Sequence, residues 1–146
     1  MGSCARGACV VPLALLPLGC LKSVPKTVAV SGRVTMDKRP LPNADISFCP
    51  IEYEQAGKRI PEASGRTDAD GRFALKLSDG TADGAVVGPS RVRVSIFDRG
   101  GDGRPGKGQL IPPRYNRETK LTFDVPPGGT SEANFDLTSG FPPATR

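Results

Sequence analysis

Short segments in which every second residue is apolar make up most of this 146-residue chain. A period of two is typical of a β-strand with one buried face, and no stretch shows sustained helical periodicity. Turn sequences such as DADG and PPGG separate the segments, in a chain with 18 glycines and 15 prolines. The alternating segments are 27–36, 45–50, 71–77, 90–98, 120–125 and 132–137. With one more strand ending near Thr67, the sequence predicts about seven strands.

This pattern predicts a single all-β domain, an antiparallel two-sheet sandwich of about seven strands. A five- or six-stranded barrel is the alternative, because both folds place alternate residues inside. The positions predicted to face the core are Val28, Val30, Val34, Met36, Ile46, Phe48, Phe73, Leu75, Leu77, Val92, Val94, Ile96, Leu121, Phe123, Val125, Ala133, Phe135 and Leu137.

The stretch TDADGRFAL raises the question of a metal site. Asp68 and Asp70 stand two residues apart with Gly71 directly after them, as in an EF-hand calcium loop. If Gly71 occupies loop position 6, however, Arg66 and Leu77 fall where the first and last ligands are required. Aspartate and glycine are also turn formers, since Asp side chains bond local amides and Gly adopts positive φ. We therefore predict a β-hairpin connection here and no metal site.

The N-terminus has the pattern of an export signal. Residues 8–18 form an apolar run with the proportions of a signal-peptide h-region, far short of the ~20 residues that span a bilayer. The run ends in LLPLGC, which looks like a bacterial lipoprotein signal with Pro17 in place of the preferred leucine. We expect cleavage before Cys20 and its lipidation, and two or more acyl chains would attach the protein stably to a membrane. An ordinary secretory signal and a buried N-terminal segment are the alternatives.

This interpretation divides the chain into a signal peptide (1–19), a tether (20–26), the sandwich domain (27–138) and a flexible tail (139–146). Two of the four cysteines leave with the signal and one carries lipid, so only Cys49 stays in the domain. One thiol cannot form an internal disulfide. Its place in ISFCP predicts a buried small hydrophobic residue, with a reactive thiol as the alternative.

The composition excludes several classes of function. The chain has no histidine, which removes the usual general base, the commonest zinc ligand and every Ser-His or Cys-His nucleophile pair. The net charge is +5, but Lys and Arg are scattered among acidic residues and form no dense run. We therefore expect a solvated basic surface and no nucleic-acid partner.

Five blocks of sequence resemble a known family: VSGRVTMDKRPLPNADISF, GRTDADGRF, GPSRVRVSI, IPPRYN and NFDL. Together they are similar to the carboxypeptidase regulatory-like (transthyretin-like, prealbumin-fold) domain, in its small bacterial lipoprotein form, over roughly Thr27 to Leu137. The resemblance implies an immunoglobulin-like or prealbumin-like sandwich, exported and lipid-anchored at the cell envelope, and it implies no reaction. Transthyretin-like enzymes that hydrolyse 5-hydroxyisourate depend on histidines and a C-terminal Tyr-Arg-Gly-Ser sequence, which this chain lacks.

The stretch DRGGDGRPGKG is the other candidate for chemistry. Its G-x-G-x-x-G spacing matches a dinucleotide fingerprint, but that site needs a helix opening at the glycines, and no helical pattern follows. Asp98 and Asp102 offer too few oxygens for calcium and have cations such as Arg104 close by. We expect a long mobile loop here. The 99–109 and 51–63 loops are the predicted ligand-binding surfaces, because binding residues often lie on loops.

These observations favour a non-enzymatic, lipid-anchored module with a structural or protein-interaction role at the cell envelope, without a cofactor. Its partner would be the membrane, through the lipid, and an unidentified envelope protein or glycan. One alternative is a carbohydrate- or small-ligand-binding module that uses the two loops. Tyr115 would either cap the sandwich or offer an aromatic face to such a ligand. Another alternative is an enzyme that uses the carboxylates of Asp98 and Asp102.

Overall fold

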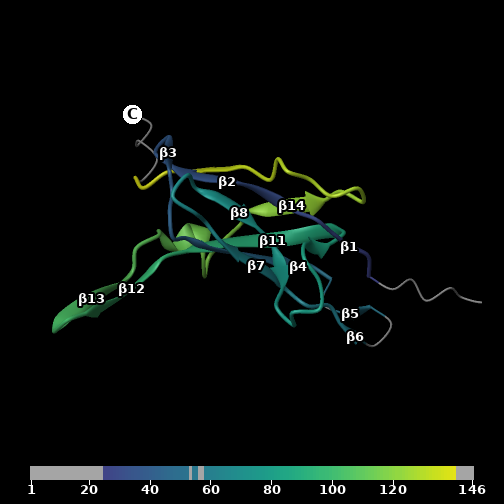
Figure 1. Ribbon diagram of the computed structural model, residues 1–146, viewed down its shortest axis with the longest axis horizontal. Helices are drawn as coiled ribbons and strands as arrows, with labels where there is room; N and C mark the ends of the chain where they lie inside the picture. The colour runs from purple at the N-terminus through teal and green to yellow at the C-terminus, as the bar shows by residue number, and fades with distance from the viewer. Residues whose placement is uncertain (1–24, 53, 56–57, 141–146) are drawn as a thin grey trace, which may run out of the picture.

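The computed structural model describes residues 25–52, 54–55 and 58–140. The predicted all-β fold is confirmed, with two larger sheets packed face to face and three two-stranded ladders at their margins (Figure 1). The helical element in these ranges is one 3-10 turn, η1 (Pro113–Tyr115). Within the same ranges, no helix is long and apolar enough to cross a membrane.

The first layer is a five-stranded antiparallel sheet in the order β14-β11-β4-β7-β9. Its strands are β14 (Thr122–Val125), β11 (Gly88–Ser95), β4 (Asp45–Pro50), β7 (Ala63–Arg66) and β9 (Lys76–Leu77). The two central strands are in the register that the alternation requires, because Val92 pairs with Phe48 and Val94 pairs with Ile46, all of them buried. A slip of one residue would turn these side chains toward solvent.

The second layer is built on β2 (Ser31–Met36), which pairs with β8 (Arg72–Ala74), β3 (Arg39–Pro40) and β15 (Phe135–Leu137). The pair of β15 with β2 is parallel, whereas the sequence predicted a wholly antiparallel sandwich. The parallel direction of β15 follows from the path of the chain between β14 and β15. The chain leaves β14 in the first layer, crosses to the second, and runs beside β2 from the Val30–Thr130 bridge onward.

Three short ladders complete the fold: β1 (Thr27–Val28) with β10 (Ala85–Val86), β5 (Glu54–Gln55) with β6 (Lys58–Arg59), and β12 (Phe97–Gly101) with β13 (Arg104–Gln109). Two strands predicted as continuous are each divided between ladders. Segment 27–36 forms β1 and β2, and segment 71–77 forms β8 and β9. The second division occurs at Leu75. Its amide donates to the carbonyl oxygen of Val30, the residue that precedes β2.

The core lies between the two layers, as the alternation predicted. The predicted inward positions Val34, Ile46, Val92 and Val94 have no exposed surface. At the centre, the ring of Phe48 lies 5.7 to 6.5 Å from the rings of Phe73, Phe123 and Phe135. Aromatic contacts of this kind add about 0.5–1.5 kcal/mol each to the effect of burial. Val28, Met36, Ile96, Leu121 and Phe123 are only partly buried at the edges of this core.

Candidate functional site

The aspartates of TDADGRF form a hydrogen-bonded turn. Oδ1 of Asp68 accepts the amides of Asp70 and Arg72, each at 2.9 Å, and the amide of Gly71 donates to the Asp68 carbonyl oxygen. Gly71 has a φ of 74°, which favours glycine. The sequence predicted that this turn joins two paired strands, and this prediction is wrong. The strand before the turn, β7, belongs to the first layer, and the strand after it, β8, belongs to the second. The turn therefore carries the chain from one sheet to the other.

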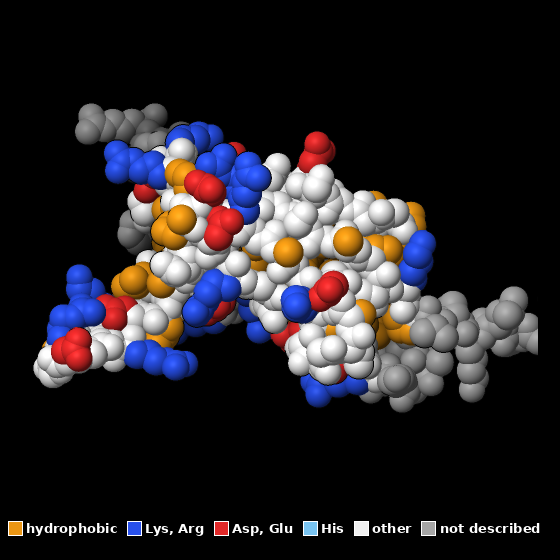
Figure 2. Space-filling model, viewed as in Figure 1, with side chains coloured by type: hydrophobic (Ala, Val, Ile, Leu, Met, Phe, Trp, Pro, Cys, Tyr) orange, Lys and Arg blue, Asp and Glu red, His pale blue; other side chains and the backbone are white. Residues whose placement is uncertain are grey.

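The glycine-rich stretch predicted as a long loop is a β-hairpin formed by β12 and β13. It projects at the left of Figure 1, and charged side chains of both signs cover it in Figure 2. Asp102 and Gly103 have φ values of 50° and 78° and lie between the paired residues Gly101 and Arg104, which is the pattern of a two-residue hairpin turn. Glycine also permits close strand approach, since a Cβ on Gly106 would lie 2.3 Å from a backbone oxygen.

The hairpin brings together two of the predicted ligand residues, Asp98 and Arg104. The Asp98 carboxylate accepts the amide of Gly100 at 2.9 Å and faces the Arg104 guanidinium at 3.4 Å. The Gly100 hydrogen bond, with smaller contributions from Lys107 and Arg104, holds the pKa of Asp98 below its ordinary value. Asp98 is therefore ionised and engaged within the hairpin, whereas Asp102 lies in the turn.

Tyr115 lies apart from the hairpin strands, at the end of η1, and packs against the core. Its hydroxyl oxygen accepts the amide of Thr138 at 3.0 Å, and the Arg114 guanidinium lies 5.0 Å from its ring centre. Arg114 also donates to the carbonyl oxygens of Thr138 and Gly140. Ser139 donates to Asp37, and with the Arg114 bond to Gly140 the hydrogen bonds extend through residue 140.

The 51–63 segment contains the short β5–β6 ladder instead of an irregular loop. A small cleft of about 310 Å³ adjoins it, lined by Arg59, Ile60, Pro61, Glu62 and Ser78. Nearby, Cys49 is free and only 2% exposed, which confirms the prediction of a buried residue. Burial, together with the Glu62 carboxylate, raises the pKa of the Cys49 thiol, so this thiol is a poor nucleophile at neutral pH.

A larger open cleft, of about 670 Å³, was not predicted from the sequence. We call it the arginine cleft, because Arg33, Arg66 and Arg72 line it. Each of these arginines directly follows a glycine in the sequence, but so does Arg104, so this feature does not single them out. Only the pairing of β2 with β8 brings Arg33 and Arg72 together, and pairing across 39 residues cannot be read from spacing.

Some of the predicted residues lie outside the part of the chain that the structure describes. Cys20 and the signal segment lie outside the described residues, as does most of the predicted tail. In the described ranges, no group of three or more His, Cys, Asp or Glu side chains could hold a metal ion.

No protein-family model, curated protein or solved structure matches the chain. The family resemblance therefore remains a prediction based on the five sequence blocks.

Proposed function

We propose that this protein is a lipid-anchored, exported interaction module of the carboxypeptidase regulatory-like type. In this proposal residues 20–26 form the tether, and Cys20 carries the lipid. The β-sandwich then presents a binding element to an envelope partner and performs no reaction. The finer immunoglobulin-like or prealbumin-like class belongs to the same proposal, and the two packed sheets support it.

The observation that carries the proposal is the position of β1 relative to the β12–β13 hairpin. The two lie at opposite ends of the long axis of the molecule (Figure 1). An anchor at Cys20 would hold the β1 end near the membrane, since the seven residues 20–26 span at most about 25 Å when extended. The hairpin would then reach away from the bilayer toward other envelope components.

The hairpin also has the surface of a binding element. In the described part of the chain, β12 and β13 pair only with each other, so each has a free edge of backbone donors and acceptors. Such edges accept an added strand from a partner. Phe97 at the base of the hairpin is 61% exposed, which offers an apolar contact beside the free edge.

The state of Asp98 argues against a role as a general acid. A general acid needs a raised pKa so that it holds its proton at working pH. The pKa of Asp98 is instead lowered by the Gly100 amide and by Arg104. Asp98 therefore lacks the raised pKa of a general acid, and its Oδ1 atom is already engaged by the Gly100 amide.

The anchor is tested by labelling cells with a palmitate analogue. Wild-type protein should take up the label, and Cys20→Ala should lose both the label and the processing step. Cys49→Ala is the matched control, because Cys49 is buried in the sandwich and should leave labelling unchanged. An unlabelled wild type, or unchanged processing of Cys20→Ala, would refute the anchor.

The binding role is tested by shortening the hairpin. Replacing residues 99–107 by Asn-Gly leaves the pair Asp98–Gly108 flanking a two-residue turn, which is the favoured length for a hairpin. The shortened variant should keep the thermal midpoint and the lipid label but lose the envelope crosslinks that the wild type forms. Identical crosslinks in both proteins would exclude the hairpin as the binding element.

A further inference from the structure

The arginine cleft contains an unfavourable pair of like charges. In the antiparallel pairing of β2 with β8, Arg33 lies directly opposite Arg72. Like charges in this position destabilise a sheet by repulsion. Arg66 lines the same cleft from the end of β7, so three guanidinium groups gather at one place on the surface. The fold alone gives no reason for this arrangement.

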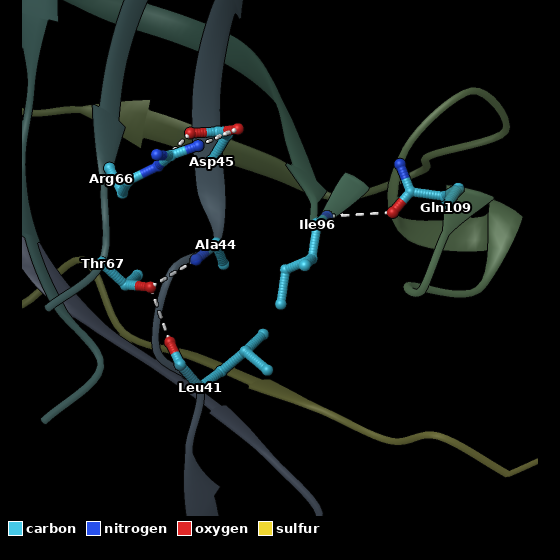
Figure 3. A network of polar contacts seen from close by, with 7 residues as sticks. All are labelled: Leu41, Ala44, Asp45, Arg66, Thr67, Ile96 and Gln109. Atoms are coloured by element: carbon cyan, nitrogen blue, oxygen red, sulfur yellow. Dashed lines mark hydrogen bonds and ion pairs between the residues drawn. The ribbon is translucent and has the colours of Figure 1, made fainter. Parts of the chain in front are cut away.

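The three arginines differ in what already holds them. Arg66 donates to both carboxylate oxygens of Asp45, at 2.8 and 3.1 Å, and is therefore occupied (Figure 3). Arg33 donates from Nε to the carbonyl oxygen of Asp70 at 2.9 Å, a neutral contact that orients the fork. Within the described ranges, neither Arg33 nor Arg72 makes a salt bridge. Two guanidinium forks are thus free of carboxylate partners.

Several other polar groups that line the cleft can also donate hydrogen bonds. Oδ1 of Asn134 accepts the amide of Arg33 at 3.0 Å, which leaves the Asn134 NH₂ group to donate. The hydroxyls of Ser31 and Ser131 add two further donors. The carboxylate in the lining is that of Asp68, whose Oδ1 already accepts two backbone amides of its turn. A ligand for this cleft must therefore supply acceptors.

We infer that the arginine cleft binds an oxyanion group, a carboxylate or phosphate carried by a small molecule or a sugar, between Arg33, Arg72 and the Asn134 amide. A planar guanidinium fork matches the oxygens of both groups. The anion would also neutralise the repulsion between the paired arginines. The cleft is larger than a single ion requires, which leaves room for the rest of the ligand. The inference does not depend on the anchor or on the hairpin.

The test is a titration of the ¹⁵N-labelled sandwich, residues 25–146, alongside the full chain, with acetate, glucuronate and inorganic phosphate at constant ionic strength. Saturable shifts of the Arg33, Arg72 and Asn134 amides are expected. Arg72→Ala should weaken binding by about tenfold or more, the effect of losing a charged hydrogen bond. Arg91→Ala, which removes an exposed arginine from β11 in the other sheet, should leave binding unchanged.

The comparison of ligands identifies the source of the oxyanion. Tighter binding of glucuronate than acetate would indicate an acidic sugar, and tighter binding of phosphate would indicate a phosphate ester or the free ion. Arg72→Lys should bind more weakly than the wild type, since lysine keeps the charge but loses the fork. The inference is overturned if no anion saturates the shifts, or if Arg91→Ala and Arg72→Ala weaken binding equally. Thermal midpoints of all three variants establish that each is folded.

Discussion

The hydroxyl oxygen of Thr67 accepts the backbone amide of Ala44 at 2.8 Å, and the same hydroxyl donates to the carbonyl of Leu41 at 2.6 Å (Figure 3). Thr67 is only 2% exposed, so these bonds hold the turn before β4 from inside the protein. Thr67→Val keeps the shape of the side chain but leaves a buried donor and acceptor unsatisfied. We expect it to lower the free energy of unfolding by about 1–3 kcal/mol.

Urea unfolding measures this loss, and Thr67→Ser provides the control because it keeps the hydroxyl. The serine variant should be closer to the wild type than the valine variant. Equal stability of the two variants would contradict a role for these hydrogen bonds.

Gly71, the glycine of the TDADGRF turn, is expected to be more sensitive to substitution than Gly80. Its φ is 74°, and a Cβ there would lie 2.4 Å from the carbonyl oxygen of Val34 in β2. Gly80 has nearly the same φ, 72°, but a Cβ there would meet no atom within 4 Å. Gly80→Ala should therefore cost only the backbone strain, about 1–2 kcal/mol. Gly71→Ala should lower the free energy of unfolding, measured by thermal unfolding, clearly more than Gly80→Ala does. Equal losses in the two variants would show that the β2 backbone moves aside at little cost.

Calcium should leave the thermal midpoint of the protein unchanged, because Oδ1 of Asp68 already serves two amides of its own turn. Thermal scans with millimolar calcium and with a chelator should overlay. Asp68→Ala should lower the free energy of unfolding by about 0.5–2 kcal/mol, the usual effect of losing a capping side chain. Asp68→Asn keeps an acceptor oxygen and should lose less. A calcium-dependent rise in the midpoint would restore the metal-site interpretation.

The base of the projecting hairpin depends on Gln109. Its Oε1 accepts the amide of Ile96 at 2.9 Å (Figure 3). The same oxygen accepts the amide of Ile111 at 3.1 Å. Gln109→Ala removes this acceptor and should speed hydrogen exchange at both amides by about fivefold, if each bond contributes about 1 kcal/mol. Gln109→Glu retains an acceptor oxygen and should keep both amides protected from hydrogen exchange. Unchanged exchange in the alanine variant would show that the strand ladder alone fixes the hairpin.

Acid should weaken the attachment of the segment after β15. The hydroxyl and amide of Ser139 donate to Asp37, and these bonds hold the pKa of Asp37 below its ordinary 3.8. Because the folded pKa is the lower one, this contribution to stability is complete above the unfolded pKa and disappears as pH falls through the folded pKa. Asp37→Asn should flatten the dependence of unfolding free energy on pH below about pH 4.

The control for this pH dependence is Asp124→Asn, which changes an exposed carboxylate in β14. Urea unfolding at a series of pH values should show the full acid dependence in that variant. An equally steep dependence in Asp37→Asn would mean that the Ser139 contact adds nothing to stability.

Local alternation was sufficient to predict the core of this fold. Val92 and Val94 pair with Phe48 and Ile46 in a register that buries all four side chains, and a period of two excludes a slip by one residue. The hairpin was missed because glycine and charged residues replace the alternating apolar residues, although Asp102-Gly103 carries the turn signal. Local sequence contains no information on which strand lies opposite which across long separations.

The same limit applies to the candidate site. The sequence drew attention to Asp98, Asp102 and Tyr115 because they stand near glycines and prolines that indicate loops. The structure distributes them among a strand, a turn and a packed cap. Arg33 and Arg72 gave no signal as single residues, and their significance comes only from the β2–β8 pairing.

The parallel pairing of β15 with β2 sets the order in which the protein can be completed. Thr35 and Asp136, which this pairing joins, lie 101 residues apart, so β2 is synthesised well before its partner β15. Until Phe135 emerges, β2 lacks that neighbour and the aromatic cluster lacks one ring. A prematurely terminated chain would expose both, which makes it prone to aggregate and open to proteolysis.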